Sequence, residues 1–136
     1  MTESPVVTPL SRDECLALLA AARVGRVAIN IGALPAIRTV RFALSSGHVV
    51  FRVASQSALC RAASGVVAFQ ADHYDPDSGV GWCVEVVGRS RRIVDPTLLA
   101  PLRALPLEAW TPGGEGDHFF RVGLDSMSGQ LVRLPH

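Results

Sequence analysis

The sequence predicts a mainly β fold, an antiparallel barrel with a few short helices, and three observations support this prediction. From Val24 onward, hydrophobic and polar residues alternate with a period of two, which is typical of strands with one face in solvent. Several such segments follow one another with only short turns between them, which favours an antiparallel meander. The helical segments do not alternate with the strands as βαβ units do. We therefore expect one domain spanning all 136 residues.

Amino-acid composition and net charge limit the kinds of molecule that this protein is expected to bind. The chain is 49% hydrophobic, 18% charged and 6% aromatic, enough to build a core of valine, leucine and alanine. A formal net charge of +1 gives no global field that attracts nucleic acid or an anionic membrane surface. The first residues lack the pattern of a secretory signal, and no apolar run reaches the roughly 18 residues of a membrane span. Three well-separated cysteines without a Cys-x-x-Cys pair indicate reduced thiols, so we expect a cytoplasmic protein. From its charge and its lack of a long apolar segment we expect no nucleic-acid and no membrane partner.

The first predicted element is a helix that follows a polar N-terminal arm, residues 1–10. Residues Ser11 to Glu14 have the spacing of a capping box, in which a serine side chain and a glutamate side chain satisfy two free backbone amides. The apolar residues that follow recur at three- and four-residue intervals, so we expect a helix from Arg12 to about Ala22. Gly25 then stands where the chain must leave the helix.

Three strands come next, separated by turns at residues 31–33 and 45–47. In the first of them, hydrophobic and polar positions alternate, which predicts one face in the core and one in solvent. The other two are rich in the branched residues that strands favour. The three predicted strands read VGRVAIN, LPAIRTVRFAL and HVVFRVA.

The middle of the chain is expected to contain a short helix and two further strands. Helical composition returns over residues 56–63, and the segment GVVAFQAD after it is a strand. A loop rich in Asp, Pro and Gly is predicted over residues 72–81. It leads into the longest strand-like segment, GWCVEVVGRSRRIV, in which Gly88 indicates a bulge or a bend at a barrel corner.

The C-terminal part is expected to contain a helix, a loop and a hairpin. Asp95 and Pro96 are typical of a helix start, which predicts a helix over residues 96–105. Residues 111–117 read TPGGEGD and are flexible enough to form a mobile loop. The tail, residues 118–134, is predicted to form a hairpin with its turn near residues 125–129.

Five segments follow one another in a specific order and spacing: VGRVAI, LPAIRTVRFAL, HVVFRVASQSAL, VVAFQADHYDPDSGVGWCVEVVGRSRRIVD and HFFRVGLDSMSGQ. They resemble the pyridoxamine 5'-phosphate oxidase-like family, flavin-binding split barrels of actinobacterial type. The resemblance extends from about Ser11 to Arg133 and is most specific over residues 72–88. It implies a six-stranded Greek-key split β-barrel that forms a homodimer, with two flavin or deazaflavin sites across the dimer interface.

The resemblance also implies which residues contact the cofactor, expected to be FMN. The segment RTVRF matches the strand beside the ring system, FRV matches the strand that approaches the ribityl chain and the phosphate, and SAL matches the phosphate turn. Trp82 and Cys83 match positions that reach the cofactor from the partner subunit, although a core position for Trp82 stays open, and relatives carry serine in place of Cys83. The predicted cofactor-binding residues are Arg38, Thr39, Val40, Arg41, Phe51, Arg52, Val53, Ser57, Ala58, Leu59, Trp82 and Cys83.

The phosphate turn departs from the family pattern. Relatives usually have a lysine before the leucine of this turn, where this sequence has Ala58. A charge-assisted hydrogen bond contributes about 1.5 to 3 kcal/mol, so losing it weakens phosphate binding by about one to two orders of magnitude. Arg52 and Arg61 are the candidates to compensate, and Gln130 stands where many relatives have arginine. Ser57 caps a helix whether or not the turn binds phosphate.

Other polar groups are assigned structural roles. Arg38 and Arg41 are three residues apart and so lie on opposite faces of a strand, which lets at most one point into a given site. The same alternation places Arg89 and Arg91 on one face and Arg92 on the other, as on a solvated strand. The four histidines share no metal-ligand spacing, so no metal site is predicted.

The function implied by the resemblance is that of an oxidoreductase, in which hydride moves between the flavin ring and a small organic substrate. No residue stands out as a catalytic acid, and substrate contacts are expected from the interface groove and from residues 110–117. Two alternatives remain open. The cofactor is a deazaflavin or haem, or the protein is a cofactor-free dimer that binds a small molecule, which the missing lysine favours.

Overall fold

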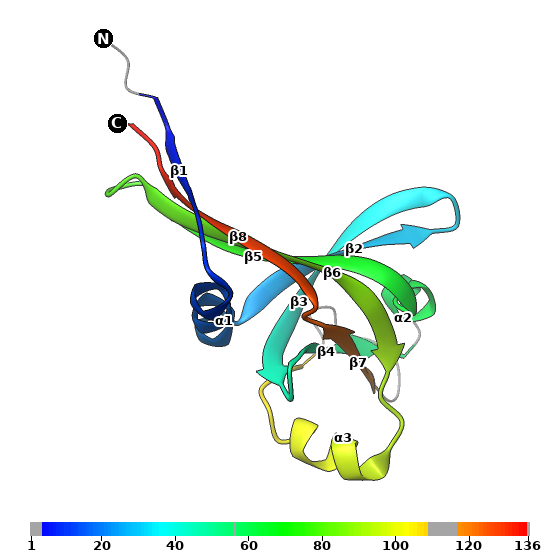
Figure 1. Cartoon of the computed structure of the whole chain (residues 1–136). Helices are drawn as coiled ribbons and strands as arrows, with labels where there is room; N and C mark the ends of the chain where they lie inside the picture. Colours follow the sequence, from blue (N-terminus) through cyan, green and yellow to red (C-terminus); the bar gives the residue numbers. More distant parts are fainter. Residues whose placement is uncertain (1–3, 56, 109–116, 136) are drawn as a thin grey trace.

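The strands form one continuous sheet that closes on itself. The computed structural model describes residues 4–55, 57–108 and 117–135. Within these ranges the strand order is β1-β8-β6-β5-β2-β3-β4-β7, and a further pairing of β6 with β7 closes strands β2 to β7 into a six-stranded antiparallel barrel (Figure 1). The strands are β1 (Val6–Pro9), β2 (Val24–Ile31), β3 (Leu34–Ser45), β4 (His48–Ala54), β5 (Gly65–Asp75), β6 (Val80–Arg92), β7 (Asp117–Gly123) and β8 (Ser126–Arg133).

The barrel has the predicted Greek-key connection. Strands β2, β3 and β4 form a meander joined by tight turns, and the chain then crosses over through α2 (Ala58–Ala62). It returns as β5, which pairs with β2 at the other side of the meander. This order, with the fourth strand beside the first, defines a Greek key and confirms the predicted fold class.

Strand β6 is where the barrel splits. From Val80 to Val87 its outer edge pairs with β8, whereas from Ser90 to Arg92 it pairs with β7. The register with β5 continues unbroken through Gly88, so this glycine marks a bend and a change of partner rather than a bulge in that pairing. A Cβ atom at Gly88 would lie 2.9 Å from the carbonyl oxygen of Gly123, so the close approach of the two backbones requires glycine here.

Helix α1 (Arg12–Ala21) begins with the predicted capping box: Ser11 Oγ accepts from the Glu14 amide and Glu14 Oε1 accepts from the Ser11 amide. Cys15 and Leu19 anchor the helix in the main core, and burial raises the pKa of the Cys15 thiol. The helix ends at Ala22 without a glycine. Gly25 is therefore not the residue at which the chain leaves the helix; it lies within β2, where the predicted strand VGRVAIN has it, and leaves room for a phenylalanine ring of β5.

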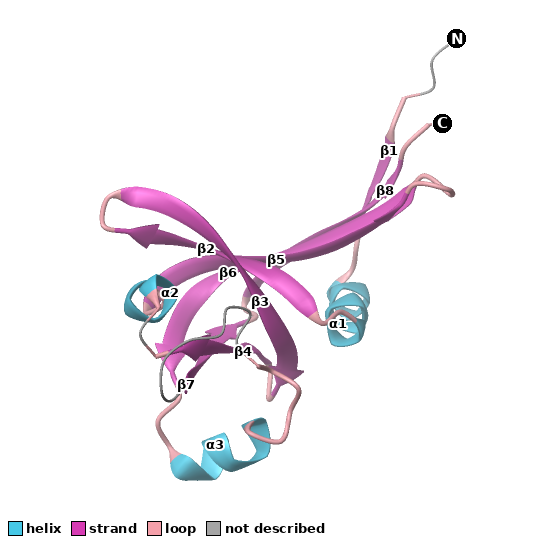
Figure 2. Ribbon diagram, turned by 180° about the vertical axis from the view of Figure 1, so that it is seen from behind, coloured by secondary structure: helices cyan, strands magenta, loops and turns pink. Residues whose placement is uncertain are grey.

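Two hydrophobic clusters stabilise the barrel. The main cluster fills its interior, where Phe51 and Phe120 stack with ring centroids 5.9 Å apart and Phe69 packs edge-on against a neighbouring ring. The second lies outside the barrel under α3 (Pro96–Leu102), whose Leu102 packs with Val50 and Phe119. Helix α3 thus covers the outer face of β4 and β7, as Figure 2 shows from behind.

The prediction of a polar arm over residues 1–10 was partly wrong. Residues Val6–Pro9 form β1, which pairs with β8 in the register Val6 to Arg133. The arm was misread because its valines are more than half exposed, so no alternation revealed a strand. Strands β1 and β8 and the far halves of β5 and β6 leave the barrel together, with the two chain ends at the tip (Figure 2).

The predicted loop over residues 72–81 is mostly strand. Strand β5 continues to Asp75 and β6 begins at Val80, so only a short turn connects them. The Asp75 carboxylate accepts from the Asp77 amide at 3.0 Å, and this hydrogen bond holds the pKa of Asp75 below its usual range. A turn stabilised by its own side chains leaves the flanking polar residues free to extend the hairpin.

The predicted C-terminal hairpin is also wrong. Strands β7 and β8 are consecutive, but they do not pair with each other in the described structure; β7 pairs with β4 and β6, and β8 with β6 and β1. The chain turns at residues 124–125, earlier than predicted, and the two strands diverge along opposite halves of β6. Among the described helices, none has the length and apolar character that crossing a bilayer requires.

Candidate functional site

Four of the predicted cofactor-binding residues have side chains in the core. Val40, Phe51, Val53 and Leu59 are at most 7% exposed and belong to the main cluster. Their alternation with polar neighbours fixes these side chains inward, so only their backbone groups are available to a ligand.

Arg38 and Arg41 lie on opposite faces of β3, as predicted. Arg41 stands in register with the exposed Val24, whereas Arg38 stands opposite the buried Val27. The Arg38 guanidinium donates to the carbonyl oxygen of the residue before it at 3.0 Å. Arg41 forms an ion pair with Glu108, with 2.7 Å between Nη1 and Oε2, so its charge is partly neutralised within the chain.

Thr39 and Cys83 are both half-buried on the outer face of the sheet, but on separate strands. Strands β2 and β5 lie between β3 and β6, which places Thr39 and Cys83 about 14 Å apart at the usual strand spacing. Gln70 of β5 lies in between and donates from Nε2 to Cys83 Sγ at 2.9 Å. One chain therefore does not bring Cys83 to the strand beside the expected ring, and its contact with a cofactor from a partner subunit stays a prediction.

The side chain at the start of the phosphate turn is already engaged. Ser57 Oγ donates to the carbonyl oxygen of Ala54 at 2.8 Å and accepts from the amide of Cys60 at 3.1 Å, which makes it the N-cap of α2. The amides of Ala58 and Leu59 lie in the first turn, where a helix has no acceptor for them. No acidic residue lies in this turn. Of the described residues 57–59, the turn therefore offers a phosphate the amides of Ala58 and Leu59, and the Ser57 hydroxyl proton is already engaged.

Arg52 is one of the two cations, with Arg61, that the sequence offers as a replacement for the missing lysine. Its Nε lies 2.6 Å from Asp117 Oδ2, and its guanidinium lies over the Phe119 ring at 5.3 Å from the centroid. The two groups are close, yet Arg52 Nε has no hydrogen-bond partner among the described residues, so the contact is an ion pair only. Both side chains are less than a third exposed, so the attraction between them is only partly screened. Arg52 is thus balanced by a carboxylate and does not replace the missing lysine without a rearrangement.

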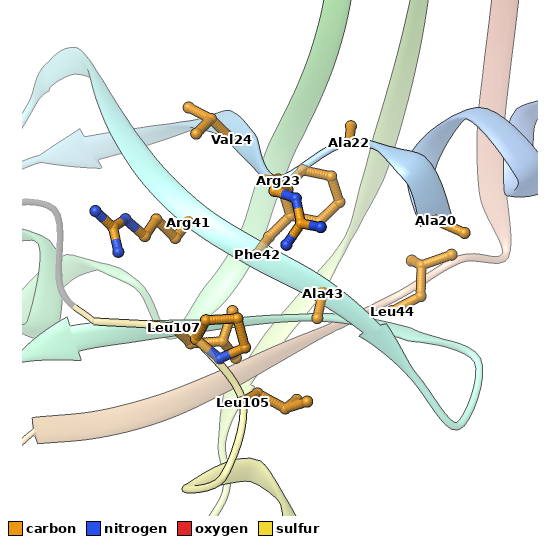
Figure 3. Close-up of a pocket in the computed structure, with 11 residues that line it drawn as sticks. Ala20, Ala22, Arg23, Val24, Arg41, Phe42, Ala43, Leu44, Leu105 and Leu107 are labelled. Atoms are coloured by element: carbon orange, nitrogen blue, oxygen red, sulfur yellow. The ribbon is translucent and has the colours of Figure 1, made fainter.

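A pocket lies between α1, β3 and the segment that follows α3. Its volume is about 560 Å³, within the range of small-molecule sites. Phe42, Leu105 and Leu107 supply apolar walls, and Arg23 and Arg41 supply two guanidinium groups. Figure 3 shows both guanidinium groups on the side of Val24 and the two leucines on the opposite side. An apolar slot with a few convergent polar groups suits a planar conjugated ring with polar edges.

Trp82 borders a second hollow next to this pocket. It is half-buried, packs against the main core and shares a hollow of about 420 Å³ with His73 and Asp72. Arg23 and Val24 line both hollows, so the two adjoin at the junction between α1 and β2, and we call them together the groove. Arg41 of β3 lines the first hollow and Trp82 of β6 lines the second, and these are the two predicted site residues found in the linings.

Several residues at this groove were not predicted from the sequence. Arg23 follows α1, and Leu105, Leu107 and Glu108 follow α3, where no motif marks them; only the packing of both segments against β3 brings them together. The predicted loop over residues 110–117 lies outside the described residues except for Asp117. In the part of the chain that is described, no three His, Cys, Asp or Glu side chains gather as metal ligands.

Comparison with known proteins identifies the family. The model of the family described as pyridoxamine 5'-phosphate oxidase matches residues 11–131. An uncharacterised protein of Mycobacterium tuberculosis is 38% identical over 110 residues, which cover 76% of this chain and 72% of that protein. The match thus includes the whole barrel and both groove-lining strands.

Two solved structures share both sequence and architecture with this chain. A FAD-binding protein from Mycobacterium smegmatis is 31% identical, with a TM-score of 0.81 and coverage of 94% of this chain and 100% of that chain. A FAD-binding protein from Mesorhizobium loti is 25% identical, with a TM-score of 0.77 and coverage of 95% and 98%. Together with the split barrel described above, these matches show that the chain belongs to the pyridoxamine 5'-phosphate oxidase family.

Proposed function

We propose that this protein binds a flavin and transfers hydride between the flavin and a small organic substrate. The observation that carries the proposal is the pocket of about 560 Å³ against β3, with apolar walls and two guanidinium groups, in a member of this family. Arg23 and Arg41 are placed to bond the polar edge of a ring system, while Leu44 and Leu105, the half-buried leucines of the lining, contact its faces. FMN is the cofactor expected from the sequence, and the FAD-binding relatives make FAD an equal candidate.

The ring end of a flavin fits this chain better than the phosphate end. The apolar pocket accommodates a ring, whereas the turn at Ser57 offers two amides and a cation already paired with Asp117. We propose that a second copy of the chain completes the site in a homodimer. Trp82 and Cys83 lie on β6, which β5 and β2 separate from β3, and are the residues assigned to reach the partner's cofactor.

When bound, the flavin supplies the hydride chemistry, and the chain supplies binding and exclusion of water. The leucines after α3 shield the pocket, and the Arg41–Glu108 ion pair borders it. The substrate is a small organic molecule that lies against the ring. The described residues place no carboxylic acid or histidine inside this pocket, so protons are exchanged through solvent or through the substrate.

The proposal is tested by titrating the cofactor-free protein with FAD, FMN and a deazaflavin while flavin and tryptophan fluorescence are recorded. Saturation by one of them at micromolar concentration is expected. Arg23→Gln removes an arginine of the pocket that has no ion pair in the described chain, so the affinity should fall about tenfold. Arg103→Gln removes an exposed arginine at the end of α3 and serves as the matched control. Equal affinities in the two variants would place the ring elsewhere.

A second candidate is favoured by the turn itself. Because the Ser57 hydroxyl and the Arg52 guanidinium already have partners, the chain is also consistent with a cofactor-free dimer that binds a small molecule in the same apolar pocket. The same titration separates the two functions. Absence of binding by every flavin and by haem would favour the binding module.

A further inference from the structure

The split in the barrel creates a hollow that the proposed function does not use. It has a volume of about 300 Å³ and lies where β7 and β8 diverge along β6. Arg89, Arg91, Arg121, His48, Asp125 and Ser126 line it, and we call it the cationic notch. His48 starts β4, whereas the turn at Ser57 follows the end of that strand, so the notch and the phosphate turn lie at opposite ends of β4.

The three arginines of the notch keep their charges without a partner in the chain. The ion pairs of the described residues involve Arg26, Arg41 and Arg52, and none involves Arg89, Arg91 or Arg121. Asp125 supplies the one carboxylate of the lining, and its oxygen turns back over Gly123. The notch therefore has a local excess of positive charge in a chain whose net charge is only +1.

Two of these arginines face each other. Arg91 of β6 and Arg121 of β7 are direct cross-strand partners, which places their Cβ atoms about 5 Å apart on the same face. Like charges in this arrangement destabilise a sheet. Arg121 is also half-buried beside the second hydrophobic cluster, which limits how far its guanidinium can move away.

The floor of the notch is backbone. Gly88 and Gly123 approach so closely that a side chain at Gly88 would collide with the opposite carbonyl group. The exposed Ser126 adds a hydroxyl group to the lining, and His48, whose Nδ1 lies 2.9 Å from the Ser46 carbonyl oxygen, keeps Nε2 as a second polar group. The lining thus combines guanidinium groups with hydroxyl and imidazole groups around bare backbone.

We propose that the cationic notch binds a phosphate group, either inorganic phosphate or the phosphate of a small ester. A guanidinium group can donate two hydrogen bonds to two oxygens of one phosphate. A phosphate dianion between Arg91 and Arg121 would attract both cations and so offset the repulsion between them. A volume of about 300 Å³ accommodates a phosphate with a small substituent. The site is independent of flavin, because the proposed ring pocket lies between α1 and β3 and shares none of these residues.

The test compares thermal unfolding in sodium phosphate with unfolding in sodium chloride at equal ionic strength. Millimolar phosphate should raise the Tm, and Arg91→Gln or Arg121→Gln should weaken this response about tenfold. Arg103→Gln should leave the response unchanged, and Asp125→Asn should strengthen it because a repelling carboxylate is lost. In chloride alone, Arg121→Gln should unfold at the same Tm as the parent protein or above it, which shows that the variant folds.

Amide chemical shifts locate the binding. Phosphate should move the signals of Gly88, Gly123 and Ser126 rather than those of Ala58 and Leu59. Glycerol 3-phosphate serves as a second probe. If it binds more tightly than inorganic phosphate, the site is one for a phosphate ester; if the two bind equally well, the site is one for phosphate itself. The proposal is overturned if phosphate gives no Tm shift beyond chloride, if Arg121→Gln responds like the parent, or if the shifts appear only at the α2 turn.

Discussion

The turn at Ser57 and the cationic notch are two places where the described residues offer hydrogen-bond donors to a phosphate, and they differ in how many of these donors already have partners. At the turn, the serine hydroxyl caps α2 and the neighbouring Arg52 is paired with Asp117. At the notch, Arg91 and Arg121 face each other with no acidic partner in the described chain. The turn matches a family motif and the notch matches none. Affinity for an anion depends on donors that the fold leaves unsatisfied, and a motif alone does not reveal them.

The largest effect is expected from Gly88→Ala, which acts on the notch. The new methyl group would lie 2.9 Å from a backbone oxygen that cannot rotate away, so the variant should lose about 1 to 3 kcal/mol of unfolding free energy. The stabilisation by phosphate should also be lost, because the backbone between the arginines of the notch is displaced. Chemical denaturation with and without phosphate measures both the unfolding free energy and this stabilisation. Gly123→Ala is the matched control, since its methyl group has only an ordinary contact with Asp125 at 3.7 Å, and a comparable loss there would contradict the steric explanation.

A smaller effect is expected from Asp117→Asn, which acts on the turn. The substitution removes the charge that balances Arg52 and should lower the unfolding free energy by about 1 kcal/mol. If the Arg52–Asp117 ion pair is what prevents the turn from binding phosphate, Arg52 should become available in this variant. Phosphate should then raise the Tm of the Asp117→Asn, Arg121→Gln double variant more than that of Arg121→Gln alone, in which the notch is weakened. Thermal unfolding with and without phosphate measures it. An unchanged response would show that the turn lacks more than a free cation.

The smallest effect is expected from Glu14→Gln. Glu14 is an acidic residue in the first turn of α1, and the first turn of α2 has none. The Ser11 amide and hydroxyl hold the pKa of Glu14 below its ordinary value of 4.5. A lowered pKa gives stability that is present above this value and is lost as the pH falls through the pKa of the folded state. Glu14→Gln should therefore flatten the decline of unfolding free energy below about pH 4.5. Glu85→Gln, an exposed residue outside the described ion pairs, is the control, and identical acid profiles for all three proteins would contradict the prediction.

Local patterns predicted the elements whose causes are local. The capping box at Ser11 gave the start of α1, and alternation from Val24 gave the buried face of β2. The number of barrel strands and the Greek key came from the resemblance to a family and were confirmed. Pairing partners were harder, because a period of two identifies a strand but not its neighbour. The tail therefore read as a hairpin, although its two strands pair with different parts of β6.

The candidate sites show the same limit. Alternation placed Arg89 and Arg91 on one face correctly, and the run was interpreted as a solvated strand. Arg121 and His48 join them only through the pairing of β7 with β4 and β6, which no local signal encodes. The Asp117 carboxylate beside Arg52 was missed for the same reason. Contacts between residues far apart in sequence decided which cations are neutralised and which remain free.

The role of β7 as the closing strand has a consequence for folding. It joins β4 to β6, so the ring of strands stays open until a segment far along the chain has been synthesised. A nascent chain that ends before Asp117 lacks both β7 and β8, so β4 and the whole outer edge of β6 are unpaired, while most of its core residues are already present. Unpaired edges of this kind recruit other strands. Aggregation during translation should therefore be greatest for truncated chains that contain β6 but lack β7.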